Sequence, residues 1–510
     1  MKRISLLFAL LILAVFPGFA GEVSQERAAS VATSFFASAP TKSQETSVQL
    51  VATFPEILTK APDRAPALYV FERGAGGYVV VSGDDVSLPV VGYSLSGQFP
   101  KGTDLPDNMR SLLEWYVSII EYARAQGWKA AAPVRSAWED IGAAPGSSDR
   151  VVLETARWGQ GAPYNDLCPS ENGQKCPTGC VATAMAIIMR YSQYPEKGSG
   201  TLPGYDYGWD SEQDTYLYHL DGFDLGHVYR WDLMPMNYRS GFYSQEEGAQ
   251  VARLMYDLGV MSRMDYAPGG SGAPGTSPLL LAEYFGYDKQ MRFLDRAQVS
   301  DTRWEQLIRD EIDAGRPVFH CGFYESGGHA FVIDGYEGRY FSINYGWSGG
   351  SAFYLLTPPV DGNAERLTQF TEWQDMVTHI EPDRGGEAYV SFTVPNVYRP
   401  FPWDFLSKSF TIGQTYLWIS SSTGSGSAEM CYALFDRDEV FKSTVSDPFT
   451  VSSDNASVPQ ASCRITVPIE DGDRVLLARR DASGWLALPH TRNGFLQFDL
   501  SRTLPEMVTP

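Results

Sequence analysis

The sequence predicts an α+β protein made of three successive units: a small α+β unit, a larger α+β unit and an all-β unit. The chain has 510 residues, 44% of them hydrophobic and 13% aromatic, which suits about three cores at roughly 100 to 200 residues per domain. The apolar periodicity fades twice, at residues 129–150 and 382–386. After the second break, short runs rich in Val, Ile, Phe and Tyr alternate with turns, which is typical of a β-sandwich.

The first twenty residues have the pattern of a signal peptide. Lys2 and Arg3 precede the apolar residues 4–16, and a small-x-small exit ends at Ala20. No later stretch reaches the roughly 18 apolar residues that a membrane span needs. We therefore expect cleavage after Ala20 and a secreted or extracytoplasmic protein, in the periplasm, at the cell surface or outside the cell, with no membrane span.

The charge balance excludes one class of partner. The formal net charge is -21, and Lys and Arg do not gather into clusters. Because neutralising phosphates requires such clusters, nucleic acid is not an expected partner.

Residues 21–128 predict the small α+β unit. An Ala-rich amphipathic helix over residues 25–37 precedes two β-like runs, 67–73 and 77–82, which a glycine-rich turn joins into a hairpin. Residues 107–126 then place apolar side chains at helical spacing, with Asp107 as the expected cap. Residues 129–150 are rich in Ala, Pro, Gly and Ser, and predict a linker and a target for proteolysis.

The larger unit, residues 151–383, carries a cysteine at an expected helix start. Cys180 ends a Pro-Thr-Gly-Cys turn and is followed by an almost wholly apolar helical run. Unpaired N–H groups at a helix N-terminus favour a thiolate, so Cys180 is a candidate nucleophile. A structural cysteine that begins a core helix is the alternative for this residue taken alone.

A histidine far downstream supplies a candidate base. His329 follows two glycines, including Gly328, and begins an apolar strand, and residues 340–344 form the return strand. If the turn is centred on residues 336 and 337, Asn344 lies opposite His329 at about 5 Å and orients its ring. The order Cys, His, Asn is that of papain-like nucleophilic catalysis. Oxyanion donors would be the backbone N–H of Cys180 and, if the loop before it folds back, the side chain of Gln160.

These stretches resemble the streptopain-like cysteine peptidases of streptococci and Bacteroides-type bacteria. The matching residues are 160–165, 178–184, 327–335 and 344–347, and residues 69–92 are similar to the family's inhibitory prodomain. The resemblance implies a papain-like cysteine peptidase domain preceded by a small α+β prodomain that inhibits it, and endopeptidase activity on protein or peptide substrates after zymogen maturation. It also implies that Gln160, Cys180, His329 and Asn344 act as oxyanion donor, nucleophile, base and orienter, with no metal or organic cofactor.

The chain also departs from the family pattern. Tyr345 stands where the family usually has Trp, although Trp347 remains available to shield the His329 and Asn344 pair. Residues 384–510, the expected β-sandwich, have no counterpart in the minimal enzyme, so their partner is not predicted. The glycine-rich residues 267–275 lack the P-loop Lys, and we interpret them as a wall of the substrate cleft, with a plain surface loop as the alternative. The expected cleft residues are Gly270, Ser271, Gly328, Tyr345 and Trp347.

The six cysteines allow several arrangements in an exported protein. With Cys180 as a reactive thiol, five remain, so at least one more is free, most simply Cys321. Bridges between Cys168 and Cys176 and between Cys431 and Cys463 are expected, although connectivity does not follow from sequence. A zinc site on the first three cysteines is a disfavoured alternative, because no histidine pair accompanies them.

Two other functions fit parts of the sequence. A Cys-His acyltransferase or amidase acting on cell-wall peptide would use the same pair of residues. A surface-binding protein would place its activity in the C-terminal unit on an inactive scaffold, although an intact Cys180, His329 and Asn344 set argues against this.

Overall fold

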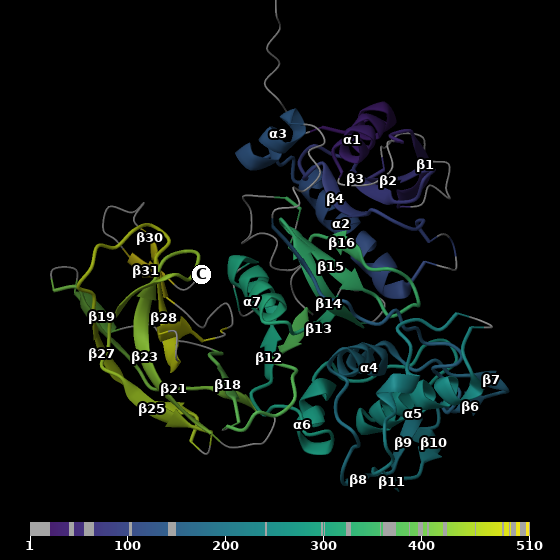
Figure 1. Ribbon diagram of the computed structural model, residues 1–510. Helices are drawn as coiled ribbons and strands as arrows, with labels where there is room; N and C mark the ends of the chain where they lie inside the picture. The colour runs from purple at the N-terminus through teal and green to yellow at the C-terminus, as the bar shows by residue number, and fades with distance from the viewer. Residues whose placement is uncertain are drawn as a thin grey trace, which may run out of the picture.

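The computed structural model (Figure 1) is described below as an N-terminal, a middle and a C-terminal region. It describes residues 21–39, 45–55, 66–100, 102, 105–140, 149–239, 242–296, 299, 301–322, 328–357, 359–360, 374–386, 388–395, 401–404, 407–421, 426–453, 455–481, 484–488, 490, 496–499 and 506–508. The expected signal peptide lies outside the described residues. Within them, no helix is both long and apolar enough to cross a membrane.

The N-terminal region, called the prodomain below, has helices packed on a meander of four strands. The predicted hairpin is confirmed, since β2 and β3 pair from Leu68 with Ser82 to Glu72 with Tyr78. The elements are α1 (Gln25–Ser38), β1 (Val48–Phe54), β2 (Leu68–Arg73), β3 (Tyr78–Ser82), β4 (Val90–Ser94), α2 (Asp107–Ala125) and α3 (Ala132–Glu139).

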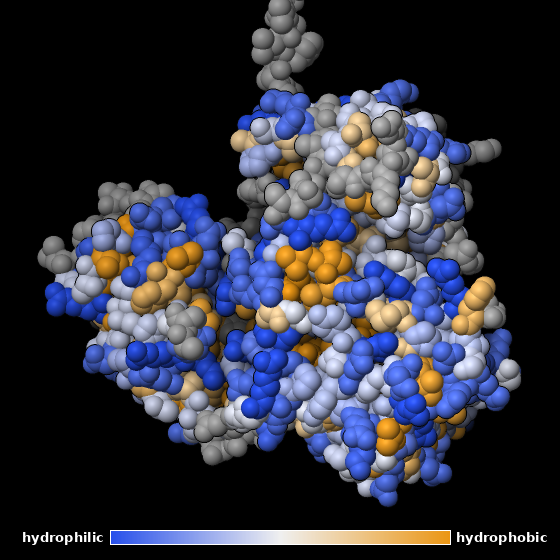
Figure 2. Space-filling view, in the orientation of Figure 1, coloured by the Kyte–Doolittle hydropathy of each residue, from blue (hydrophilic) through white to orange (hydrophobic). Residues whose placement is uncertain are grey.

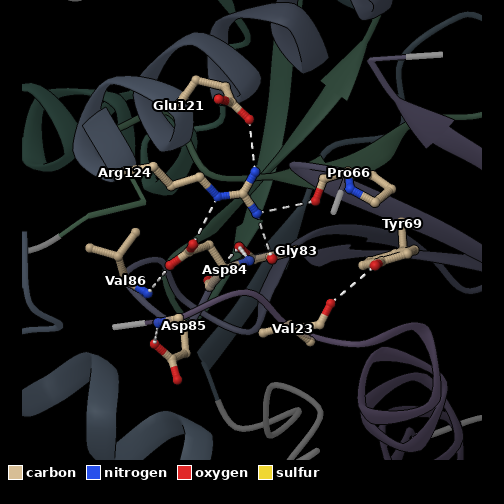
Figure 3. Close-up of polar contacts among 11 residues, drawn as sticks. Val23, Pro66, Tyr69, Gly83, Asp84, Asp85, Val86, Glu121 and Arg124 are labelled. Atoms are coloured by element: carbon tan, nitrogen blue, oxygen red, sulfur yellow. Dashed lines mark hydrogen bonds and ion pairs between the residues drawn. The ribbon is translucent and has the colours of Figure 1, made fainter. Parts of the chain in front are cut away.

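A buried arginine fastens α2 to the strands (Figure 3). The guanidinium of Arg124 donates to the Asp84 carboxylate at 2.8 Å, to the Gly83 carbonyl at 2.7 Å and to the Pro66 carbonyl at 3.3 Å, and it also pairs with Glu121. Because a buried charge needs most of its donors satisfied, this set of acceptors fixes where the C-terminal end of α2 lies.

Two sequence expectations in this region were wrong. Asp107 is the first residue of α2 and Pro106 is its N-cap, without a side-chain capping bond. Part of the expected linker is helical, because the Ala-rich α3 buries Val134 and Trp138, and the Trp138 indole donates to the Ser87 carbonyl at 2.7 Å. Ala and Pro suit a first helical turn as well as they suit a linker.

The middle region, called the catalytic domain below, joins a helical lobe to a β lobe. The helical lobe has α4 (Cys180–Ser192), α5 (Gln245–Met261), α6 (Leu281–Tyr284), the 3₁₀ turns η3 (Trp231–Leu233) and η4 (Ser277–Leu280), and the short strands β6 (Ser170–Glu171), β7 (Gln174–Lys175), β8 (Thr201–Leu202), β9 (Tyr205–Asp210), β10 (Thr215–Leu220) and β11 (Phe223–Asp224). The β lobe has β5 (Arg150–Val152), β12 (Arg292–Asp295), α7 (Asp301–Asp313), β13 (Val318–Gly322), β14 (His329–Glu337), β15 (Tyr340–Asn344), β16 (Ala352–Tyr354) and β17 (Asp375–Thr378).

One eleven-stranded sheet runs through both regions. Its order is β1-β2-β3-β4-β16-β15-β14-β13-β17-β12, and β5 also pairs with β14. The junction is the antiparallel pair β4 and β16, where Tyr93 lies opposite Phe353 and Gly92 opposite Tyr354. A Cβ at Gly92 would lie 2.1 Å from the Tyr354 ring, so only glycine lets the two strands meet here. One hydrophobic core covers both sides of the junction.

The surface fits this arrangement. In Figure 2, hydrophilic residues cover most of the visible face, and apolar groups gather over the central sheet near β15. This places the main visible apolar patch where the prodomain meets the catalytic domain.

The described C-terminal residues are all β, as predicted. A seven-stranded sheet around β23 and β28 faces smaller sheets across a core that includes Phe392, Phe410 and Leu434. The strands are β18 (Val390–Thr393), β19 (Phe401–Asp404), β20 (Ser409–Ile412), β21 (Thr415–Tyr416), β22 (Trp418–Ser421), β23 (Ser427–Phe435), β24 (Phe441–Thr444), β25 (Phe449–Ser452), β26 (Ser457–Val458), β27 (Ala461–Arg464), β28 (Arg474–Asp481), β29 (Gly484–Ala487), β30 (Leu496–Asp499) and β31 (Glu506–Val508).

Candidate active site

Cys180 is the first residue of the buried helix α4, where the sequence placed it. Gly179 before it has a φ of 84°, and a Cβ there would lie 2.6 Å from the Met264 sulfur and 2.9 Å from the Ser271 carbonyl oxygen. Only glycine fits this conformation and this space. The Thr-Gly-Cys turn therefore sets the direction in which the thiol leaves the helix.

The Cys180 thiol lies against the start of β14. Its sulfur accepts from the backbone N–H of Ala330, the residue after His329. Figure 1 shows α4 beside β13 and β14, with which it packs. The structure thus brings the predicted nucleophile to the neighbour of the predicted base, although the two are 149 positions apart in the sequence.

The electrostatics of this pair differ from the sequence expectation. Burial raises the pKa of the Cys180 thiol, and the N–H groups of Ala330, Val181 and Cys180 only partly oppose it. Burial also lowers the pKa of His329, against a smaller opposing effect of Asp107. Both shifts favour neutral side chains, so the precursor disfavours the thiolate that the helix start alone would promote.

The hairpin that carries His329 and Asn344 has a different register from the predicted one. Asn344 lies opposite Val332, and not opposite His329. The strand β14 continues to Glu337, and the turn is Gly338 and Arg339 with Gly338 at a φ of 55°, which alone would place Asn344 opposite Ile333; the bulge at Asp334 moves its partner back by one residue to Val332. A symmetric turn centred on residues 336 and 337 was therefore the wrong assumption.

Asn344 is held by the segment that follows β5. Its Nδ2 donates to the Thr155 hydroxyl at 2.9 Å and to the Ala156 carbonyl at 2.8 Å, and its Oδ1 accepts from the backbone N–H of Gly346 at 3.2 Å. In this precursor arrangement the amide is therefore committed to backbone and hydroxyl partners beside the start of the catalytic domain.

Asp334 is a buried carboxylate that sequence reasoning did not assign to the site, and it shares the Thr155 hydroxyl with Asn344. Asp334 accepts from the hydroxyls of Thr155 at 2.6 Å, Ser342 at 2.6 Å and Ser351 at 2.9 Å. Burial raises the Asp334 pKa, and these donors oppose the shift. The bulge at Asp334, which the strand pattern does not reveal, is the feature that gives this residue its partners.

Gln160 lies beside the nucleophile turn, because the intervening loop does fold back. The backbone N–H of Thr178 donates to the Gln160 carbonyl at 3.1 Å, and the Asn165 amide donates to the Cys176 carbonyl at 3.0 Å. Gln160 is buried, which fits a side chain directed inward and not a solvated loop residue.

The expected cleft residues fall into two groups. Ser271 packs on the nucleophile turn through a 2.8 Å bond from its hydroxyl to the Pro177 carbonyl, while Gly270 and Gly328 are exposed. Trp347 is exposed, and its neighbour Ser348 donates its backbone N–H to the Trp158 carbonyl, two residues before Gln160. Tyr345 is different, because it is buried in the core shared with the prodomain.

The prodomain reaches this site through the first turn of α2. Asn108, which is fully buried, donates from Nδ2 to the Tyr345 carbonyl at 2.7 Å and to the Ala330 carbonyl at 3.5 Å. Asp107 beside it acts on the charge of His329. The N-terminal end of α2 therefore lies beside His329, the predicted base.

The expected disulfides are not formed, and all six cysteines are free thiols. Burial raises the pKa of the Cys168 thiol to about 12. Cys431 and Cys463 belong to different hydrophobic clusters of the C-terminal domain. Among the described residues no group of three or more His, Cys, Asp or Glu side chains is arranged to hold a metal ion.

Comparison with known proteins adds two family matches. Residues 158–354 match the peptidase C10 family, and residues 20–120 match the Spi protease inhibitor family. The first covers Gln160, Cys180, His329 and Asn344, and the second covers most of the prodomain.

Three relatives extend these matches. The chain is 36% identical over 401 residues to the thiol protease/hemagglutinin PrtT of Porphyromonas gingivalis, covering 75% of this chain and 44% of that protein. It is 33% identical to streptopain of Streptococcus pyogenes over 336 residues, 62% of this chain and 81% of that protein. A solved structure of prointerpain A from Prevotella intermedia is similar with a TM-score of 0.52 and 29% identity, covering 67% of this chain and 100% of that one.

The chain thus spans less than half of PrtT but most of streptopain, and the matched part contains the nucleophile turn, the histidine strand and an inhibitor-like N-terminal region. On the strength of these matches and of the site geometry, the chain belongs to the peptidase C10 family of cysteine peptidases, with its prodomain attached.

Proposed function

We propose that this protein is a secreted cysteine endopeptidase that is made as a zymogen and hydrolyses protein substrates through a thioester. The observation that carries the proposal is the contact between the Cys180 sulfur at the start of α4 and the backbone of Ala330, the residue after His329. A thiol and an imidazole supplied by neighbouring elements are what nucleophilic acyl transfer requires.

The residues divide the reaction among them. His329 takes the thiol proton, and Cys180 attacks the peptide carbonyl carbon. As the carbon–nitrogen bond breaks, His329 returns the proton to the leaving amine. Water then hydrolyses the thioester and frees the thiol. The backbone N–H of Cys180 and the buried side chain of Gln160 stabilise the oxyanion, and Asn344 orients the ring of His329.

The prodomain keeps this machinery inactive. Asn108 occupies the space beside Ala330 and Tyr345. Burial of the Cys180 thiol raises its pKa and so disfavours the thiolate. Activation requires a cut after the prodomain, for which residues 129–150 are the proposed region. Because α3 is docked on the prodomain, the Ala-, Pro-, Gly- and Ser-rich part beyond it, residues 141–148, is the preferred place.

The test is casein cleavage by the activated protein with and without a thiol alkylator. Cys180→Ala and His329→Ala should each lower the rate by at least about 10³-fold, whereas Asn344→Ala should leave partial activity. Cys431→Ala, a buried cysteine in the C-terminal domain, is the matched control and should leave the rate unchanged. Undiminished cleavage by Cys180→Ala would refute the proposal.

A further inference from the structure

Three strands of the β lobe bring a row of side chains to the nucleophile. Cys321 on β13 lies opposite Ala330 on β14 and, on its other side, opposite Asp375 on β17. Directly opposed residues in an antiparallel sheet point to the same face. Ala330 is the residue whose backbone N–H meets the Cys180 sulfur, so the row begins at the nucleophile.

The row faces the helical lobe. Phe319 on β13 and Val377 on β17, two residues away from Cys321 and Asp375 on their strands, belong to the core that contains α4. With strands about 4.8 Å apart, Asp375 is about two strands, or roughly 10 Å, from Ala330. Since an extended peptide advances about 3.4 Å per residue, a long side chain within two residues of the scissile bond reaches that distance.

The glycine-rich loop joins this carboxylate to the nucleophile turn. A Cβ on Gly275 would lie 2.9 Å from Oδ1 of Asp375 and 3.2 Å from the Cys321 sulfur, so the loop passes directly over both side chains. Earlier in the same loop, Ser271 bonds to the Pro177 carbonyl, three residues before Cys180. The loop therefore borders both the thiol and the carboxylate.

Asp375 has few partners for a carboxylate in this position. The Cys321 thiol donates to it, its Oδ1 is buried without a hydrogen bond, and no Lys or Arg in the described part of the chain forms an ion pair with it. Asp295 on β12, which lies opposite Asp375, adds negative charge. Burial and Asp295 together raise the pKa of Asp375 to about 7.

Such an environment favours an incoming cation. A partly buried carboxylate with a second carboxylate beside it is stabilised when a positive group supplies charge-assisted hydrogen bonds. A neutral apolar side chain would instead leave the carboxylate buried without compensation.

We propose that Asp375 is a specificity-determining residue of the cleft that receives the guanidinium or ammonium group of an Arg or Lys side chain in the protein substrate, within two residues of the scissile bond. This inference rests on the peptidase function proposed above.

The experiment uses the activated wild-type enzyme and pairs of fluorogenic peptides that differ only by Arg or citrulline. Citrulline has nearly the shape of arginine without its charge. The pair is made for each of the two positions on either side of the scissile bond. One position should show kcat/KM higher for Arg by about 10- to 100-fold, the range expected for hydrogen bonds to a charged group.

The variant Asp375→Asn keeps the shape of the side chain and removes its charge. The ratio of Arg to citrulline should fall to about 1, while kcat/KM for the citrulline peptide stays within about threefold, because the uncharged ureido group donates hydrogen bonds to an amide oxygen as well as to a carboxylate. Asp214→Asn, at an exposed turn of the helical lobe, is the matched control and should keep the wild-type ratio.

The outcomes separate the two proposals. Cleavage of casein with a wild-type ratio near 1 at all four positions would overturn the role of Asp375 and leave the peptidase function standing. A high ratio that survives in Asp375→Asn would also overturn it. Absence of any Cys180-dependent cleavage by the wild-type protein would contradict the peptidase function itself. The wild-type ratio needs no variant, so the inference stays testable even if Asp375→Asn folds poorly.

Discussion

The two ends of the chain join the catalytic domain in different ways. The prodomain continues its sheet through β4 and β16 and shares a single hydrophobic core with it. The C-terminal domain has its own cores and meets the catalytic domain through smaller contacts, such as the Tyr389 backbone N–H to the Lys289 carbonyl at 2.9 Å. The prodomain, which is removed on activation, therefore has more extensive contacts with the catalytic domain than the C-terminal domain has.

Polar contacts reinforce this difference. The Tyr93 hydroxyl of the prodomain donates to the buried Glu337 carboxylate at 3.0 Å, and the Tyr340 hydroxyl of the catalytic domain donates back to the Val90 carbonyl at 3.0 Å. The C-terminal contact adds the guanidinium of Arg292 over the Tyr389 ring at 4.5 Å. The comparison indicates that prodomain and catalytic domain form one folding unit, while the C-terminal domain folds separately.

The largest expected effect is on thermal stability, measured in a Cys180→Ala background that prevents self-processing. Separating the prodomain after a cut within residues 141–148 should lower the Tm of the catalytic domain by about 10 °C or more, because the shared core is opened. Ending the chain at residue 383 should lower it by less than about 4 °C, the shift expected for about 1 kcal/mol. Differential scanning calorimetry measures both Tm shifts. Equal shifts would contradict the comparison between the two junctions.

A large chemical effect should appear at the nucleophile. Burial raises the pKa of Cys180 in the precursor, so the thiol stays protonated at neutral pH, and removal of the prodomain should lower that pKa. Alkylation of Cys180 by iodoacetamide near pH 6 should then be about 100-fold faster in the mature enzyme, because the thiolate is the reacting species.

Peptide mapping at a series of pH values measures that rate at each cysteine. Cys431 is the internal control, because burial raises its pKa to about 12 and it lies in the C-terminal domain, so its rate should not respond to activation. Equal rates at Cys180 before and after activation would show that the prodomain does not govern the thiol.

A smaller effect is expected from one side chain of the prodomain. Asn108→Ala removes the donor to the Tyr345 and Ala330 carbonyls, which costs about 1 to 3 kcal/mol when buried acceptors lose their partner. The intact precursor should therefore leak more activity and mature faster, by roughly 5- to 100-fold. Ser118→Ala on the exposed side of α2 is the matched control. An unchanged lag before activity in Asn108→Ala would show that the Asn108 contact does not contribute to inhibition.

The smallest effect is expected at the other junction. Tyr389→Ala removes the ring beneath Arg292, a contact worth about 0.5 to 1 kcal/mol at a partly exposed site. Casein cleavage should be unchanged, and the Tm should fall by less than about 4 °C. A clear loss of peptidase activity would mean that the C-terminal domain supports the cleft, contrary to the comparison.

Local patterns in the sequence predicted the elements of the site well. The Thr-Gly-Cys turn, the apolar helix after it and the strand that begins at His329 are encoded by neighbouring residues, and all three are found. The register of the hairpin was not predicted, because strand β14 continues to Glu337 and the turn lies at Gly338 and Arg339, two residues beyond the assumed centre. The bulge at Asp334 was also not predictable from the strand pattern, since its hydrogen-bond partners come from other segments.

The errors in electrostatics and in the linker have a common cause. A helix start favours a thiolate locally, but Cys180 is buried by segments far away in the sequence, and that burial determines the direction of the shift. Likewise, α3 is fixed by the packing of Val134 and Trp138 and by the Trp138 bond to Ser87, which the composition of residues 129–150 does not reveal. Disulfide pairing failed for the same reason, since Cys431 and Cys463 are sorted into different cores by tertiary packing.

The pairing of β4 with β16 gives activation a second stage that proteolysis does not control. While the chain is intact, the inhibitor is held at the millimolar effective concentration typical of a tethered partner. A cut removes the tether but leaves the strand pair in place, so inhibition becomes an ordinary bimolecular equilibrium. In a confined volume the nicked pair stays together, and on dilution it separates. The enzyme should therefore become active as the nicked pair is diluted, at a pace set by strand dissociation.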